Sequence, residues 1–311
     1  MRYAPLHSDL ADGPDAGAAH WLKTTDNQQI RVAHWVSDAD RGTVLLFPGR
    51  TEYVEKYGRA AREFRARGFA TITVDWRGQG LSERLLPTRA TGHIDSFADY
   101  QKDVAAMLTH ARDLGLPRPY YLVAHSMGGA IGLRALIEGL PVRAAVFSAP
   151  MWGIQMSATL RPAAWALSVT ARKLGFDGRM APGQSVENYV NRMTLETNEL
   201  TSDPEMFDYM IRQLTEAPEL GLGGPSLRWL YEALTEARHL ARLTSPRTPC
   251  VTFLGGRETI VDPARVEARM ARWPGGRLER IEGAKHEVMM EGPDTRARVF
   301  DGAAALFDAH S

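Results

Sequence analysis

The chain has 311 residues, 44% of them hydrophobic, so it is long enough to bury the core of one large domain and is neither disordered nor fibrous. Basic and acidic residues both number 37, which gives no net charge and argues against a nucleic-acid partner. The single cysteine, Cys250, excludes an internal disulfide, and no stretch has the length and apolarity of a membrane span.

Strand-like and helix-like segments alternate along the first half of the chain. Apolar runs predict an opening hairpin and then buried strands, at 20–23 with 30–36, 43–47, 69–74, 120–123 and 143–147. Helices are predicted between them, at 53–67, from a cap at Ser96 and Asp99 through Leu114, and at 130–138. This alternation predicts an α/β protein with a mainly parallel sheet covered on both faces.

The alternation stops between residues 151 and 242, where helical patches are broken by prolines and glycines. We interpret 151–242 as an inserted helical cap between two parts of the core, 1–150 and 243–311. Six of the twelve methionines lie in it, at 151, 156, 180, 193, 206 and 210. Taken singly, each is better explained by packing between cap helices, but together they give an adaptable apolar surface that suits an acyl chain.

After the cap the strand pattern resumes, with strands predicted at 251–254 and 277–281 and helices at 263–273 and 295–309. Cys250 begins the first of these strands and is expected to be buried. The second part of the core therefore extends the same sheet.

The stretch 124–128 reads Ala-His-Ser-Met-Gly and lies between a predicted strand and a predicted helix. A serine between small residues at such a strand-to-helix turn forms a nucleophile elbow, because only small neighbours let the helix approach the strand. We expect Ser126 to be a catalytic nucleophile, with Gly128 and Gly129 supplying the room. The alternative is an ordinary loop serine beside a glycine-rich helix start.

A serine hydroxyl needs an imidazole to accept its proton and an acid to orient that imidazole. His286 and Glu258 both follow predicted strands, in the order Ser, acid, His that is typical of this elbow. Asp262 is a second candidate acid, but it precedes Pro263 and suits a helix N-cap, which favours Glu258. His125 lacks such partners and is expected to pack beneath the elbow, and His93 to lie in a loop.

An acyl-transfer site also needs backbone N–H groups that stabilise the oxyanion of the tetrahedral intermediate. The residue after the nucleophile, Met127, is the first expected donor. The loop after the 43–47 strand supplies the second, for which we choose the N–H of Arg50; the alternative is that Gly49 only makes a turn.

The chain resembles the α/β-hydrolase superfamily, and within it the lysophospholipase and monoacylglycerol-lipase group related to the serine aminopeptidases. The resemblance covers residues 30–307 and rests on segments 47–53, 75–82, 93–100, 125–129, 256–258 with 260–262, and 283–287. The acid of the family stands at the position of Glu258, usually as aspartate. Two positions depart from the pattern, since Pro48 replaces a histidine and Ala124 replaces the elbow glycine.

The resemblance implies a mostly parallel eight-stranded sheet with helices on both faces and a helical cap. It implies hydrolysis of the ester of a lysophospholipid or monoacylglycerol through an acyl-enzyme on Ser126, with no metal or organic cofactor. Alternatives are an aminopeptidase or amidase that binds the substrate amine through cap carboxylates, with Glu187, Glu196, Glu199 and Glu205 available, and a non-catalytic binding protein. We expect a cytoplasmic protein with transient membrane contact through the cap; the oligomeric state is left open.

Overall fold

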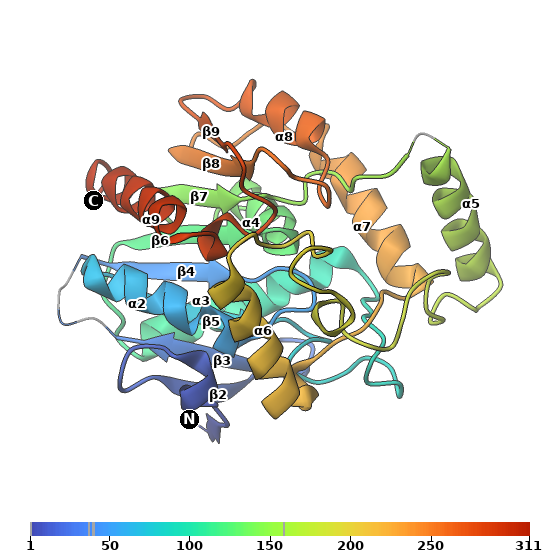
Figure 1. Ribbon diagram of the computed structural model, residues 1–311, viewed down its shortest axis with the longest axis horizontal. Helices are drawn as coiled ribbons and strands as arrows, with labels where there is room; N and C mark the ends of the chain where they lie inside the picture. Colours follow the sequence, from blue (N-terminus) through green and yellow to red (C-terminus); the bar gives the residue numbers. More distant parts are fainter. Residues whose placement is uncertain (1, 37, 39–40, 158) are drawn as a thin grey trace.

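The computed structural model describes residues 2–36, 38, 41–157 and 159–311, and its centre is a nine-stranded sheet (Figure 1). The strand order is β1-β2-β3-β5-β4-β6-β7-β8-β9. The first three pairings are antiparallel and the remaining five are parallel. The strand bounds are β1 Arg2–Ala4, β2 Ala18–Lys23, β3 Gln29–Trp35, β4 Thr43–Phe47, β5 Ala70–Asp75, β6 Tyr120–His125, β7 Ala145–Ser148, β8 Cys250–Gly255 and β9 Arg277–Ile281.

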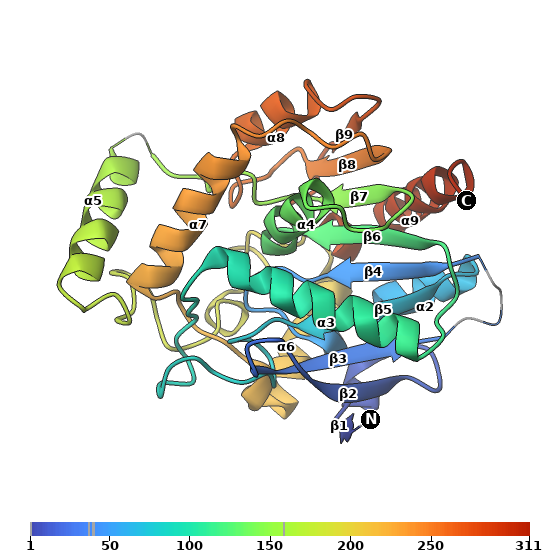
Figure 2. The ribbon, with the colours of Figure 1, turned by 180° about the vertical axis from the view of Figure 1, so that it is seen from behind.

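Helices cover both faces of this sheet. Helices α2 and α9 lie on one face, and α3 and α4 lie on the other (Figures 1 and 2). Helices α5 and α7 lie beside one another at one end of the molecule, and α6 contacts α1. The helix bounds are α1 Ser8–Ala11, α2 Gly58–Ala66, α3 Tyr100–Asp113, α4 Met127–Ile137, α5 Leu160–Lys173, α6 Pro204–Glu216, α7 Leu227–Leu240, α8 Pro263–Met270 and α9 Pro293–Asp308.

The central strands are buried on both faces, as near-continuous apolar runs predict. In β4, Leu45 and Phe47 join the core beneath α3 and α4, whereas Val44 and Leu46 join the core beneath α2 and α9. Successive side chains of a strand point to opposite faces, so one strand contributes to both cores. The carboxyl ends of the parallel strands are thereby fixed at one edge, where the functional loops begin.

The predicted α/β architecture is confirmed, and three local predictions need correction. The sheet has nine strands rather than eight, because Arg2–Ala4 adds β1 to the edge at β2. The helix expected at 53–67 is divided into a 3₁₀ turn, η1 (Val54–Tyr57), and α2. The cap expected at Ser96 and Asp99 is wrong, since neither side chain caps the following helix; Asp99 instead pairs with Lys102 at 2.7 Å.

The described residues between β7 and β8 contain α5, α6 and α7 together with two 3₁₀ turns, η3 (Val190–Arg192) and η4 (Pro218–Leu220). This helical content fits the expected insertion, and the division into a cap and two core parts stays a prediction. None of the helices in the described ranges combines the length and apolarity needed to cross a membrane.

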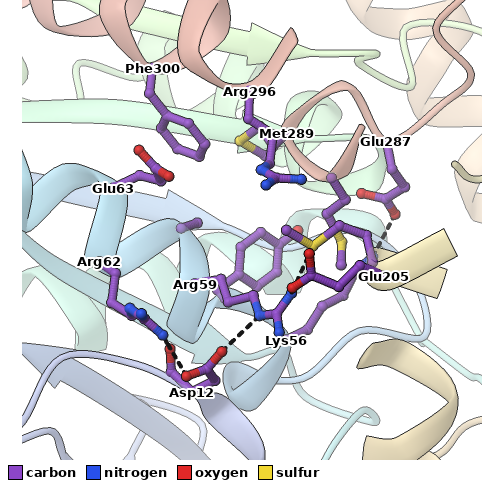
Figure 3. Close-up of a pocket in the computed structure, with 14 residues that line it drawn as sticks. Asp12, Lys56, Arg59, Arg62, Glu63, Glu205, Glu287, Met289, Arg296 and Phe300 are labelled. Carbon is purple, nitrogen blue, oxygen red and sulfur yellow. Dashed lines mark hydrogen bonds and ion pairs between the residues drawn. The ribbon is translucent and has the colours of Figure 1, made fainter. Parts of the chain in front are cut away.

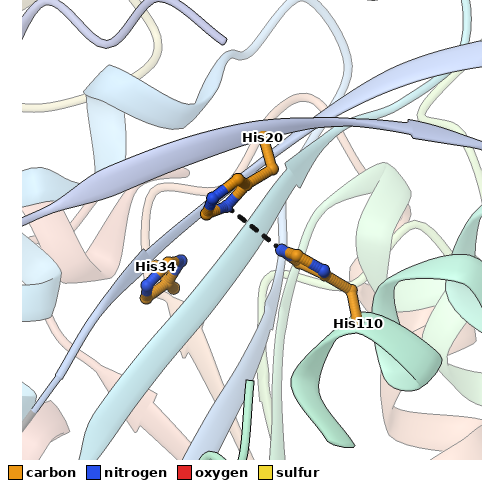
Figure 4. Close-up of side chains that lie close together, drawn as sticks. All are labelled: His20, His34 and His110. Carbon is orange, nitrogen blue, oxygen red and sulfur yellow. Dashed lines mark hydrogen bonds between the residues drawn. The ribbon is translucent and has the colours of Figure 1, made fainter. Parts of the chain in front are cut away.

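Three histidines from β2, β3 and α3 lie close together beneath the opening hairpin (Figure 4). His110 Nε2 is 3.2 Å from His20 Nδ1, and the His34 ring stacks on His20 with centroids 5.5 Å apart. His34 Nδ1 is buried without a hydrogen-bond partner among the described residues. Burial lowers the pKa of His34 and of His110 to about 4, because desolvation disfavours the imidazolium. The native cluster is therefore neutral at pH 7.

This cluster should make folding sensitive to mild acid. The unfolded chain binds protons below the ordinary histidine pKa of 6.5, whereas the native rings bind them only near pH 4, so stability falls as the pH falls between these values. The free energy of unfolding should fall between pH 7 and pH 4.5 in the wild type. With allowance for the solvent that reaches both rings, we expect this fall to be about 2 kcal/mol smaller in His34→Gln/His110→Gln. Urea unfolding at each pH measures the free energy. The exposed pair His239→Gln/His310→Gln is the control, and equal pH dependence in all three proteins would contradict the prediction.

Candidate active site

Ser126 occupies a sharp turn between β6 and α4. Its backbone angles are φ 49° and ψ −118°, in a region that L-residues rarely adopt. A Cβ at Gly128 would lie 2.2 Å from the carbonyl oxygen of Phe47, and one at Gly129 would lie 2.5 Å from Cβ of Pro150. Glycine is therefore required at both positions for α4 to approach the sheet edge. The strand–turn–helix context expected for the elbow is present.

His286 and Glu258 are brought together from loops after β9 and β8. His286 Nδ1 is 2.7 Å from Glu258 Oε2, and both side chains are almost completely buried. The other oxygen of Glu258 accepts the N–H groups of Ile260 and Val261, at 2.7 and 3.0 Å. Burial alone would raise the pKa of Glu258, but His286 and these donors outweigh it and lower the pKa. Glu258 is therefore held as a carboxylate against the imidazole.

Asp262, the other candidate acid, lies elsewhere. Its carboxylate accepts the N–H of Ala264 at 3.1 Å as the N-cap of α8, and it pairs with Arg161 at 3.3 Å. The helix-cap expectation for Asp262 is confirmed. Of the two acids, only Glu258 contacts His286 in the described structure.

Ser126 and His286 line one cavity of about 590 Å³. Within the described part of the chain, Ser126 Oγ makes no hydrogen bond with the imidazole of His286. The two side chains share a cavity wall but are not in direct hydrogen-bond contact. Such contacts are often loose before substrate binds. The wall is mostly apolar, and much of it comes from the region 151–230, including Met151, Met156, Met210 and Trp229. Three of the six methionines singled out above therefore face the cavity.

The two N–H groups expected to form the oxyanion hole are both available. In the loop after β4, the N–H of Gly49 donates to Glu52 and that of Thr51 donates to Gln79 Oε1. Neither the N–H of Arg50 nor that of Met127 has an acceptor among the described residues. Arg50 and Ser126 also line the same cavity. Free donors at these two positions suit a developing negative charge.

The glycine-rich turn after β5 braces this loop. Trp76 Nε1 donates to the carbonyl oxygen of Pro48 at 2.9 Å, and Gln79 Nε2 donates to that of Gly49 at 3.1 Å. Because Gln79 also accepts the N–H of Thr51, it holds the loop on both sides of Arg50. Sequence reasoning singled out segment 75–82 without identifying this role.

A buried charge cluster lies beneath the site and was missed from the sequence. Lys56 Nζ donates to Glu52 and to Glu287, as Figure 3 shows for Glu287. His125 Nε2 lies 3.2 Å from Glu287 and 3.6 Å from Glu52, which corrects the expectation that this histidine lacks acidic partners. The Nε2 contact is not aligned as a hydrogen bond, whereas His125 Nδ1 lies 3.1 Å from the Ser148 carbonyl.

The same cluster has the donor types of a metal site, since Glu52, His125 and Glu287 lie close together. The Lys56 ammonium already supplies the positive charge there. Despite the cost of burial, the two carboxylates raise the pKa of Lys56 and of His125, while the cations lower that of Glu287 well below its usual range. The residues therefore fit an internal ion cluster better than a metal ligand set.

A second cavity, of about 200 Å³, lies on the other side of Lys56 (Figure 3). Its charged groups pair with one another, since Arg59 contacts Asp12 and Glu205, both at 2.8 Å. This cavity does not contain Ser126 or His286. These two candidate catalytic residues therefore belong to the larger cavity.

The chain matches known proteins over most of its length. The family model described as serine aminopeptidase, S33, matches residues 38–293. A probable lysophospholipase L2 of Haemophilus influenzae is 31% identical, covering 94% of this chain and 92% of that protein. Lysophospholipase L2 of Escherichia coli is 29% identical, covering 92% and 86%.

A solved structure of a soluble variant of Saccharomyces cerevisiae monoglyceride lipase, bound to a substrate analogue, superposes with a TM-score of 0.72. It is 21% identical, and the match covers 93% of this chain and 94% of that one. This likeness confirms the α/β-hydrolase fold. The match of the family model and the 31% identity to the Haemophilus influenzae relative show that the chain belongs to the serine aminopeptidase S33 family, which has this fold.

Proposed function

We propose that the protein is a serine hydrolase that cleaves the carboxylic ester of a lipid with one acyl chain, a lysophospholipid or a monoacylglycerol. The observation that carries the proposal is that Ser126 and the Glu258-bound His286 line one large apolar cavity. The relatives named lysophospholipase, which match nearly the full length, support the same substrate class.

In the proposed mechanism, Ser126 Oγ attacks the ester carbonyl carbon while His286 accepts the hydroxyl proton. The N–H groups of Arg50 and Met127 stabilise the oxyanion. His286 then donates its proton to the departing alcohol, which leaves an acyl-enzyme. Water, deprotonated by His286, attacks this ester and releases the fatty acid. Glu258 keeps Nδ1–H of the imidazole oriented and stabilises its charged form.

The aminopeptidase alternative depends on carboxylates that could bind a substrate amine. Of the four glutamates available in the cap, only Glu187 and Glu199 line the cavity. Glu199 accepts hydrogen bonds from Thr259 Oγ1 at 3.0 Å and Tyr189 OH at 3.2 Å, and Glu205 pairs with Arg59. Both glutamates are exposed, but Glu199 is already hydrogen-bonded, and a mostly apolar wall favours a lipid over a peptide.

Replacing the nucleophile should abolish the reaction. We expect Ser126→Ala to lower turnover of monoacylglycerols and lysophosphatidylcholines by roughly 10⁴-fold or more, and to eliminate labelling by a fluorophosphonate probe. A chain-length series of both lipids measures substrate preference, and aminoacyl anilides assayed in parallel provide the comparison. Hydrolysis of anilides alone would overturn the esterase proposal, and absence of labelling in the intact protein would favour a non-catalytic binding protein.

Replacing each candidate acid with the amide of the same shape tests which one acts on His286. Glu258→Gln should lower kcat by about 10³- to 10⁴-fold, because the amide cannot stabilise the imidazolium. Asp262→Asn removes a helix-capping charge and the ion pair with Arg161, neither of which contacts His286, and should change kcat less than about threefold. Steady-state kinetics on one monoacylglycerol decides between them. The reverse order of effects would identify Asp262 as the acid.

The proposal includes contact of the cap with a lipid surface. Three apolar side chains in the segment that follows α5 are exposed, with exposed fractions of 62% for Leu174, 49% for Phe176 and 64% for Val186. The exposed basic residues Arg172, Lys173 and Arg179 lie at the end of α5 and in the same segment. An apolar patch bordered by basic residues is typical of surfaces that bind anionic membranes.

Charge placed in this patch should weaken membrane binding. We expect Leu174→Glu/Phe176→Glu to reduce cosedimentation with phosphatidylcholine/phosphatidylglycerol vesicles by at least about tenfold, because two apolar side chains no longer enter the interface. Hydrolysis of a short, water-soluble ester should be unchanged. Tyr3→Glu, which alters an exposed aromatic residue on β1, is the control. Equal sedimentation of the wild type and the patch variant would contradict the prediction.

A further inference from the structure

The guanidinium of Arg50 is a partly buried cation on the wall of the substrate cavity and has few partners. Its Nη2 donates to the carbonyl oxygen of Gly223 at 2.7 Å, and its Cζ lies 5.0 Å from the Trp229 ring centroid. Its Nε is buried and has no hydrogen-bond partner among the described residues. A buried donor left unpaired on a charged group is costly, and the cost is recovered when a ligand supplies the acceptor.

No carboxylate of the described residues forms an ion pair with Arg50. Glu52 is the acidic residue nearest to Arg50 in the chain, and like Glu287 on the cavity wall it binds Lys56 instead. Burial lowers the pKa of Arg50 to about 10, so the side chain is still cationic at pH 7. The cavity therefore holds a positive charge that an anionic ligand could neutralise.

The position of Arg50 matches the chemistry of a lysophospholipid. Because the N–H of Arg50 is a proposed oxyanion donor, the ester carbonyl oxygen of a bound substrate would lie within hydrogen-bond distance of this backbone N–H. The same number of covalent bonds separates the arginine N from Cζ as separates the ester carbonyl carbon from the phosphorus of a 1-acyl lysophospholipid. One residue can thus hold the reacting carbonyl with its backbone and the phosphate with its side chain.

We propose that the Arg50 guanidinium binds the phosphate of the substrate headgroup and makes the enzyme prefer lysophospholipids to monoacylglycerols. The inference rests on the proposed ester hydrolysis at Ser126. Two neighbouring residues shape the space of the Arg50 side chain. A Cβ at position 92 would lie 2.8 Å from Arg50 Nη2, so glycine leaves room for the guanidinium there, and the ring of Trp229 on α7 packs against it. The planar donor array of arginine suits phosphate oxygens better than the point charge of lysine does.

Kinetics on two lipids with the same acyl chain test this role. For Arg50→Met we expect kcat/KM on 1-oleoyl lysophosphatidylethanolamine to fall by about 10- to 100-fold, mainly through KM. On 1-oleoylglycerol the loss in kcat/KM should be at least about fivefold smaller, since this lipid has no phosphate and the backbone N–H is retained. Arg50→Lys should recover part of the loss. Arg192→Met, which removes another arginine from the cavity wall, is the matched control and should leave the ratio of the two lipids unchanged.

The outcomes separate this inference from the function on which it rests. An equal loss on both lipids in Arg50→Met would assign Arg50 a structural role between the loop and the cap, and would overturn the inference alone. Wild-type protein that hydrolyses only the monoacylglycerol would do the same. Wild-type protein that hydrolyses neither lipid would overturn the proposed function as well.

Inhibition distinguishes a headgroup from free phosphate. Glycerophosphoethanolamine should inhibit hydrolysis of 1-oleoylglycerol competitively in the wild type and lose this effect in Arg50→Met. Inhibition by inorganic phosphate alone, without any preference for the lysophospholipid, would show that Arg50 binds a free anion and would overturn the headgroup assignment.

Discussion

The geometry of the site depends on one constraint, the strained backbone of Ser126. A non-glycine residue held at φ 49° costs of order 1–3 kcal/mol, and such strain persists only where the surroundings fix it. Here the N–H of Ser126 donates to Ser148 on β7 at 3.0 Å, and its carbonyl accepts the N–H groups of Gly129 and Met151, both at 2.8 Å. Strand β7, helix α4 and Met151 thus all hydrogen-bond to the backbone of this one residue, so the hydroxyl is positioned before substrate arrives.

The buried charge cluster extends this preorganisation to the other catalytic loops. Glu52 accepts the N–H of Gly49 in the proposed oxyanion loop, while Glu287 directly follows His286. Lys56 binds both carboxylates, so one ammonium joins the loop after β4 to the loop after β9. Removing one partner from such a cluster would leave an unpaired buried charge, which commonly costs about 3–5 kcal/mol. The cluster therefore fixes the relative position of two loops that are far apart in the sequence.

Local patterns predicted most of the fold and of the candidate site. Strands β4, β6 and β8 have the apolar runs of doubly buried strands, and the Asp262-Pro263 pair signalled an N-cap that made Glu258 the better acid. Strand β1 was missed because three residues, one of them the exposed Tyr3, show no periodicity. The charge cluster was missed for a different reason. Lys56 and Glu287 are 231 residues apart, and a buried lysine looks like a surface lysine until the fold is known.

The segment between β7 and β8 is hydrogen-bonded to the loops that carry the proposed catalytic groups. Lys285 Nζ donates to the carbonyl oxygens of Asn198 and Thr201, and the N–H of Glu287 donates to that of Leu200 at 2.8 Å. On the opposite wall, Arg50 binds Gly223. A displacement of this segment would therefore disturb the loop of His286 and the proposed oxyanion loop together, because each is hydrogen-bonded to it. In the proposed mechanism, the same contacts therefore shape the cavity and align the reacting groups. A substrate that fits the cavity poorly and displaces this segment would also misalign those groups.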